Sequence, residues 1–219
     1  MIYLVITASL LSRYGVPQTR SDREERYRYA ITETLSHLPD TGDIRPVIVE
    51  NNGPRPTLLD HFTWNHRGVQ EKVPVVYTTH NETQFQNKGV NELMDIQAAM
   101  KAMNAIPSDM IIKVTGRYRV RSPSFFETVC RHPEKEAFVK WYNVHAQKED
   151  PNDCVLGCYA LRALYLQLLF PCALNLYDSA EVGFAQYVRR SLSSASILSM
   201  NELGVECVFA DLPTVTRYV

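Results

Sequence analysis

The chain has 219 residues, of which 45% are apolar and 21% are charged. This length and composition predict one soluble globular domain that folds without disulfides or a structural metal. The 23 Lys and Arg residues are balanced by 24 Asp and Glu residues. That balance argues against a polybasic protein that binds nucleic acid or a membrane surface.

The cysteine pattern and the apolar runs bear on the cellular compartment. The five cysteines are odd in number and contain no CxxC pair, so reduced thiols and a cytoplasmic location are expected, the host cytoplasm if the chain is viral. The apolar start, residues 1–11, lacks the basic segment and the cleavage site of a signal peptide. The longest apolar helical run, residues 160–170, is about half the length that spans a bilayer, so no transmembrane segment is expected.

Short β-branched segments alternate with helical patterns along the front of the chain. Apolar runs at residues 2–8, 45–50, 73–79 and 110–114 predict strands that are buried on both faces of a sheet. A capping box at Ser21 opens one predicted helix, and a second is predicted from Asn87 to a point before Pro107. This order predicts an α/β fold with a mostly parallel central sheet flanked by helices.

The rear of the chain is less regular. Its apolar patterns predict strands at 137–144, 153–159 and 206–210, and helices at 161–170 and 180–192. No repeat, low-complexity segment or linker marks a boundary. We therefore expect a single domain over residues 1–219, with a nucleotide-binding front.

Basic residues follow the predicted strands, at the sheet edge where α/β proteins bind ligands. Six cations are expected to converge there: Arg13, Arg20, Lys88, Lys113, Arg117 and Arg119. An anionic ligand is indicated, because arginine forks match phosphate oxygens.

Structural explanations of the same residues remain open. The basic residues between Arg20 and Arg28 alternate with acids, so most of them are expected on a solvated helix face. Lys113 lies within an apolar strand, where an ammonium needs either a bound anion or a structural ion pair. The run Glu50-Asn51-Asn52-Gly53 either forms a simple turn or presents polar side chains to a base or ribose.

Several familiar motifs are absent from the sequence. It contains no G-x-G-x-x-G, P-loop or G-x-S-x-G motif. It also lacks an Asp-x-Asp, and its histidines show no metal-ligand spacing. A divalent-metal site of the usual strand-end type therefore has no obvious candidate, and the use of manganese or magnesium is left open.

Four segments together suggest a family. They are the opening strand at residues 2–8, the strand with a polar end at 46–51, the run Asn-Lys-Gly-Val-Asn-Glu-Leu at 87–93 and, above all, Ile-Ile-Lys-Val-Thr-Gly-Arg-Tyr at 111–118. With these segments the chain resembles nucleotide-sugar glycosyltransferases of the GT-A type, in particular those of large DNA viruses and some bacteria. The resemblance covers roughly residues 1–160.

The resemblance implies that residues 1–120 bind a nucleoside diphosphate sugar and that residues 121–219 form the acceptor side, for a glycan or glycoprotein. The sugar, hexose or pentose, is not specified. The implied donor-binding residues are Thr7, Arg13, Glu50, Asn51, Asn52, Lys88, Gly89, Asn91, Lys113, Thr115, Gly116 and Arg117. Tyr118, Trp141 and Tyr142 are candidates for stacking on the acceptor, although strand aromatics commonly belong to the core.

Many GT-A enzymes hold a metal on the diphosphate through Asp-x-Asp after the fourth strand, where this chain has Thr115-Gly116-Arg117. We expect Lys113 and Arg117, with Lys88 and Arg13, to stabilise the leaving diphosphate instead, which puts dependence on manganese or magnesium in doubt.

An inverting transferase also needs a carboxylate that takes the acceptor's proton. Glu181 is the first candidate for this base, and Asp153 and Glu92 are the reserves. Asp178 and Glu181 also have the spacing of a capping box.

Two other functions remain open. One is a sugar-nucleotide pyrophosphorylase, for which the loop after the first strand is poor in glycine. The other is a non-catalytic module that binds a nucleotide sugar or a glycan.

Overall fold

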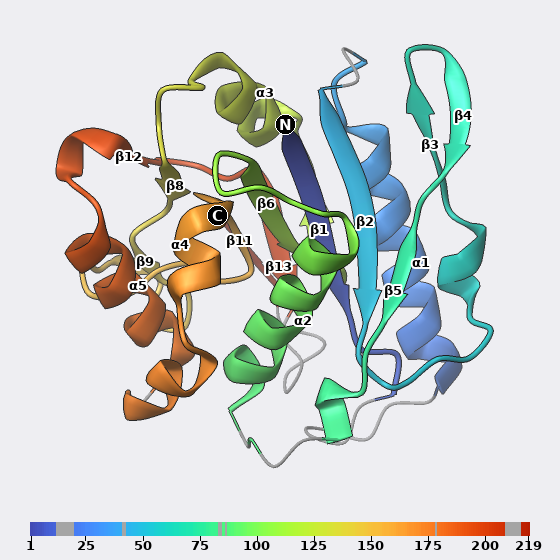
Figure 1. Ribbon diagram of the computed structural model, residues 1–219, viewed down its shortest axis with the longest axis horizontal. Coiled ribbons are helices and arrows are strands. Elements are labelled where there is room, and N and C mark those ends of the chain that lie inside the picture. Colours follow the sequence, from blue (N-terminus) through green and yellow to red (C-terminus); the bar gives the residue numbers. More distant parts are fainter. Residues whose placement is uncertain (12–19, 41–42, 83–84, 86, 178, 209–215) are drawn as a thin grey trace.

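A computed structural model describes residues 1–11, 20–40, 43–82, 85, 87–177, 179–208 and 216–219. It is an α/β fold built on a seven-stranded sheet in the order β12-β8-β11-β6-β1-β2-β5 (Figure 1). The strands are β1 (Ile2–Ala8), β2 (Ile44–Glu50), β5 (Val75–Tyr77), β6 (Met110–Thr115), β8 (Ala137–Val139), β11 (Cys158–Arg162) and β12 (Ile197–Ser199). Strand β11 is antiparallel to β6 and β8, whereas the other pairings described in this sheet are parallel. The mostly parallel central sheet is therefore confirmed.

Smaller elements surround this sheet. They are the hairpin β3 (Thr63–His66) and β4 (Val69–Lys72), the pair β9 (Tyr142–Asn143) and β10 (Lys148–Glu149), and a small sheet of β7 (Arg119–Val120), β13 (Val205–Val208) and β14 (Thr216–Tyr218). Four 3-10 turns are also described: η1 (Leu58–His61), η2 (His80–Glu82), η3 (Pro171–Leu176) and η4 (Ser194–Ser196).

Helices cover both faces of the central sheet (Figure 1). They are α1 (Arg20–Ser36), α2 (Lys88–Ala102), α3 (Ser124–Arg131), α4 (Ala163–Leu168) and α5 (Ala180–Ser191). Leu4 and Ile6 of β1 belong to the apolar core that includes residues of α1 and α3, whereas Val5 belongs to the core that includes residues of α2, α4 and α5. Because side chains alternate between the two faces of a sheet along a strand, the odd-numbered residues of β1 point to the face that α2 covers.

The predicted elements agree best with the structure in the first half of the chain. Strand β1 has the predicted bounds, and β2, β6, α1 and α2 lie close to theirs. The predicted strand at 153–159 is correct only at its end, because residues 153–157 form a connection and β11 begins at Cys158. Helix α3 and the β3–β4 hairpin were not predicted. Among the described residues, no helix combines the length and the apolar character needed to cross a bilayer.

One glycine allows a close contact between the connection that precedes β11 and the turn between β6 and β7. A Cβ on Gly157 would lie 2.0 Å from Cε2 of Tyr118, whose ring covers this position. Tyr118 is buried, at 8% exposure. The absence of a side chain at residue 157 is therefore what lets the Tyr118 ring pack here.

We expect Gly157→Ala to lower the free energy of unfolding by about 1–3 kcal/mol, because the Tyr118 ring must move away from the added methyl group. Urea denaturation measures this loss. In a Tyr118→Ala background the same substitution should cost much less. An equal cost in both backgrounds would contradict the contact.

Candidate functional site

A cavity of about 470 Å³ opens at the carboxyl ends of β1 and β6, the edge at which the sequence predicts a ligand. Thr7 of β1, Thr115 of β6 and Asn51, which follows β2, line it. Because β11 runs antiparallel to β6, the residues that precede β11 return to this same edge. Asp153 and the residues up to Gly157 therefore form part of the cavity wall.

The first turns of two helices meet at this cavity. Asn87 caps α2 by accepting a hydrogen bond from Gly89 N at 2.9 Å, and Ser179 caps α5 by accepting one from Val182 N at 3.2 Å. A Cβ on Gly89 would lie 2.2 Å from Cβ of Ala180, so the two turns are in direct contact. Helix N-termini carry partial positive charge, and two of them at one cavity favour an anion.

Among the described residues, the lysine and arginine side chains that line the cavity are Lys88, Arg23 and Arg117. Arg23 Nε donates to the carbonyl oxygen of Ser9 at 2.6 Å, and Arg117 Nε donates to that of Val208 at 2.8 Å. These hydrogen bonds fix both guanidinium groups against the backbone at the cavity wall.

Arg23 was expected on a solvated helix face, but it is only 8% exposed. Extending the buried stripe of Tyr27 and Ile31 back by one helical turn reaches Arg23, and this spacing is the signal that could have identified it.

The remaining arginines of the predicted cluster are Arg13, Arg20 and Arg119. Arg13 and the side chain of Arg20 fall outside the part of the chain that the structure describes. Arg119 forms an ion pair with Glu206 of β13, at 3.6 Å. Of the four predicted cations whose side chains are described, Lys88 and Arg117 line the cavity, whereas Lys113 and Arg119 do not. Arg23 joins Lys88 and Arg117 at the cavity.

The sequence leaves two partners open for Lys113, a bound anion or a structural ion pair. The structure has the ion pair. The side chain is fully buried, and Nζ lies 2.9 Å from Glu92 Oε1. Nζ also donates to Thr115 Oγ1 at 2.7 Å and to the carbonyl oxygen of Leu156 at 2.9 Å. These contacts use the three N–H groups of the ammonium. Direct contact between Lys113 and a leaving diphosphate is thus corrected to a supporting role beneath the cavity.

Glu92 is the centre of this network. Thr7 Oγ1 and Thr115 Oγ1 both donate to its Oε1. Burial by itself raises the pKa of Glu92, but the Lys113 ammonium and the Thr7 hydrogen bond outweigh that effect and hold the pKa below its ordinary value. Glu92 is therefore an ionised group on the cavity wall.

Three predicted donor-binding residues, Glu50, Asn52 and Gly116, support the site without lining the cavity. The Glu50 side chain is fully buried, pairs with Arg55 at 3.1 Å and accepts a hydrogen bond from Leu10 N. Asn52 contacts Glu50 through its side-chain amide. Gly116 N donates to the carbonyl oxygen of Thr7 at 2.8 Å, where a Cβ would not fit. Their assignment to ligand contact is corrected: they shape the turns around the cavity.

Asp95 is a buried residue of the cavity wall that the sequence analysis missed. It accepts hydrogen bonds from Thr78 Oγ1 at 2.6 Å and from Asn51 Nδ2 at 3.0 Å, and a further hydrogen bond of 2.7 Å joins it to His80 Nδ1. Burial raises the pKa of Asp95, an effect that these hydrogen bonds oppose. An acid between the core residues Leu93 and Ile96 of a predicted helix is the signal that could have found it.

Asp153 and Glu181, two of the candidates for the base, line the cavity together with Glu92 and Asp95. Burial and the nearby charge of Glu181 raise the pKa of Asp153. Because Ser179 is the N-cap of α5, Glu181 lies at the second helical position, one residue short of the capping-box position. The capping explanation for Glu181 is therefore wrong; its proposed partner, Asp178, lies outside the described residues.

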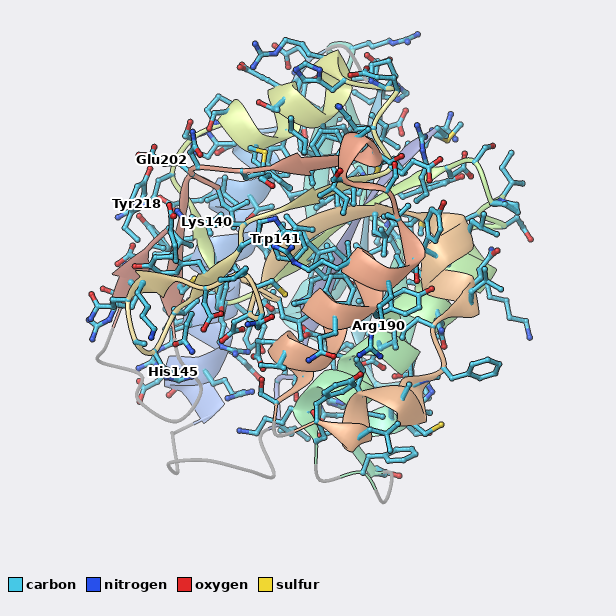
Figure 2. The ribbon with its side chains drawn as sticks, turned by 90° about the vertical axis from the view of Figure 1, so that its left-hand side faces the viewer. Lys140, Trp141, His145, Arg190, Glu202 and Tyr218 are labelled. Carbon is cyan, nitrogen blue, oxygen red and sulfur yellow. The ribbon has the colours of Figure 1, made fainter. Side chains whose placement is uncertain are left out.

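The predicted aromatic residues separate into two groups. Tyr118 lines the cavity, but Trp141 and Tyr142 do not. Trp141 packs under the Arg189 guanidinium, 4.2 Å from the ring centroid, and donates to Ser199 Oγ at 2.9 Å. It lies beside Lys140 on the face shown in Figure 2. Its role as an acceptor platform is corrected to packing against α5.

Gly89 and Asn91 complete the predicted set and line the cavity. Within the described ranges, no three His, Cys, Asp or Glu side chains are placed to hold a metal ion.

No protein-family model matches this chain, and no curated protein matches it. Among solved structures, the chain is similar to the one described as the crystal structure of A197 from STIV. The TM-score is 0.43 and the sequence identity is 11%, over 94% of this chain and 83% of that chain.

We expect Lys113→Met to lower the free energy of unfolding by about 3–5 kcal/mol, because it leaves the Glu92 carboxylate without its buried partner. Urea denaturation compares it with Arg28→Met, which breaks an exposed pair with Glu25 and should change stability by less than about 0.5 kcal/mol. Adding Glu92→Gln to Lys113→Met should restore part of the loss. If Lys113→Met and Arg28→Met lower the free energy of unfolding by the same amount, the Lys113 network is not a structural constraint.

Proposed function

We propose that this protein is a GT-A type glycosyltransferase that moves a sugar from a nucleoside diphosphate sugar to a hydroxyl group of a glycan acceptor. One observation carries the proposal: a single cavity has basic side chains and two helix N-termini together with the carboxylates Asp153 and Glu181. The first set suits a departing diphosphate, and the second suits proton transfer from an attacking hydroxyl.

The leaving diphosphate is assigned to the side of Lys88, Arg23 and Arg117. Negative charge grows on the leaving oxygen as the bond to the sugar breaks, so donors fixed before the reaction stabilise the transition state more than the ground state. Each preorganised donor contributes on the order of 3 kcal/mol. Lys113 is excluded from this set, because Glu92 neutralises its charge.

The acceptor's proton is assigned to Glu181, with Asp153 as its neighbour. The raised pKa of Asp153 means that this carboxyl binds a proton more readily than an ordinary aspartate does, which makes it the second candidate for the base. Glu92 is a weak candidate for the base, because Lys113 holds its pKa low.

The last residue of β6 and the two residues that follow it do not fit a metal-bound diphosphate. Where a divalent ion would need carboxylates, the chain has Thr115, Gly116 and Arg117, and a guanidinium would repel the ion. No step of the proposed reaction is therefore routed through a metal.

The direct test is a screen of UDP- and GDP-sugars for binding by thermal shift and for slow hydrolysis or transfer. A transferase consumes the donor, a pyrophosphorylase releases sugar phosphate when pyrophosphate is supplied, and a binding module is stabilised without turnover. Stabilisation by no nucleotide or nucleotide sugar would overturn the proposal.

With the active donor, turnover in excess EDTA should stay within about twofold of the untreated rate, because fixed cations replace the metal. The rate is measured before chelation, after it, and after manganese is added back. Complete loss that manganese restores would contradict this expectation.

Glu181→Gln should lower kcat by about 10²- to 10⁴-fold while the protein stays folded, because the amide cannot accept the acceptor's proton. Glu127→Gln is the matched control, since Glu127 is an exposed acid in the first turn of α3, outside the cavity. Steady-state kinetics with circular dichroism separate catalysis from folding. Wild-type turnover in Glu181→Gln would remove this residue from the mechanism.

A further inference from the structure

The two oxygens of the Glu92 carboxylate have different surroundings. The contacts with Thr7, Thr115 and Lys113 all go to Oε1. Within the described residues, Oε2 accepts no hydrogen bond, while the Glu92 side chain is 24% exposed and lines the cavity. One oxygen is thus held by the protein and the other is available to a ligand.

Sheet geometry fixes the direction of this carboxylate. Thr7 pairs with Thr115 across β1 and β6, and Val5 pairs with Lys113, so Thr7, Lys113 and Thr115 are all on the side of the sheet that α2 covers. Three donors on one oxygen restrict rotation of the carboxylate before any ligand arrives. An acceptor that is already oriented loses little conformational entropy on binding.

The charge of Glu92 limits what can bind at Oε2. The pKa of Glu92 is lowered, so the group is an anion that accepts hydrogen bonds and donates none. A phosphate oxygen would be repelled, whereas a hydroxyl group is a suitable donor.

The position of Glu92 relative to Lys88 indicates which part of the donor it meets. Both residues line the cavity, and they lie four residues apart on α2, about 6 Å along the helix axis. A diphosphate at the N-terminus of α2 and Lys88 therefore places the transferred sugar about one helical turn further into the cavity.

We infer that Glu92 Oε2 accepts a hydrogen bond from a hydroxyl group of the transferred sugar, which makes Glu92 a specificity-determining residue for the donor. The inference rests on the proposed function. It extends that function by assigning sugar recognition to the anion of the Glu92–Lys113 pair and diphosphate recognition to the cations around it.

The test compares each nucleotide sugar with its own nucleotide on the full chain. Calorimetry measures the Kd of UDP-glucose, UDP-galactose and GDP-mannose, and of UDP and GDP, for the wild type and for Glu92→Gln. We expect the variant to lose at least tenfold in affinity for the nucleotide sugar that the wild type binds, and less than twofold for the matching nucleotide. Equal losses for both ligands, or no loss for either, would overturn the inference.

Two further variants control for folding and position. Glu92→Asp keeps a charge near Lys113 but withdraws the carboxylate by one methylene. It takes the place of Glu92→Gln if that variant does not fold, and it should show the same selective loss of affinity for the nucleotide sugar. Thr7→Val removes one donor to Oε1 and leaves Oε2 in place, so it should reduce affinity for the nucleotide sugar by less than Glu92→Gln does. A loss as large in Thr7→Val would assign the effect to the network and overturn direct contact.

Deoxy donors identify the contact itself. With the deoxy analogue that lacks the bonded hydroxyl, wild type and Glu92→Gln should bind equally. If every deoxy analogue keeps the full difference between the two proteins, direct contact is overturned. A wild type that binds none of the nucleotides or nucleotide sugars overturns the proposed function itself, whereas binding with unselective losses overturns only the role of Glu92.

Discussion

The ion pair between Lys113 and Glu92 is the constraint on which the site depends. An ammonium in the middle of a seven-stranded sheet is tolerated only with a charged partner and a full set of hydrogen bonds, and Glu92, Thr115 and the carbonyl of Leu156 supply them. Because Glu92 belongs to α2, the pair also fixes where that helix lies on the sheet. The N-terminus of α2 is thereby held at the cavity.

The reversed direction of β11 within the central sheet has an equally specific effect. If β11 ran parallel to β6, the residues before it would lie at the opposite edge of the sheet. Its reversed direction brings Asp153 and Gly157 to the carboxyl ends of β1 and β6. The rear of the chain can therefore contribute carboxylates to a cavity whose basic groups come mainly from the front.

The sequence was sufficient for the parallel front of the fold, the edge that carries the cavity and the need of Lys113 for a charged partner. Those conclusions follow from local periodicity and from the cost of burying a charge. The choice of Glu92 as the partner, the hydrogen bonds of Asp95 and the burial of Arg23 could not be predicted, because they depend on which helix covers which face. The run at 153–159 predicts a strand although only its last two residues belong to β11, since burial in a connection and burial in a sheet give the same composition.

The contact between Gly89 and Ala180 links the two halves of the cavity through one pair of small residues. A substitution at Gly89 limits the side-chain size that position 180 can have, and the reverse also holds, because the combined volume of the two residues sets the spacing of α2 and α5. Among relatives of this chain, we expect the two positions to covary at nearly constant summed size.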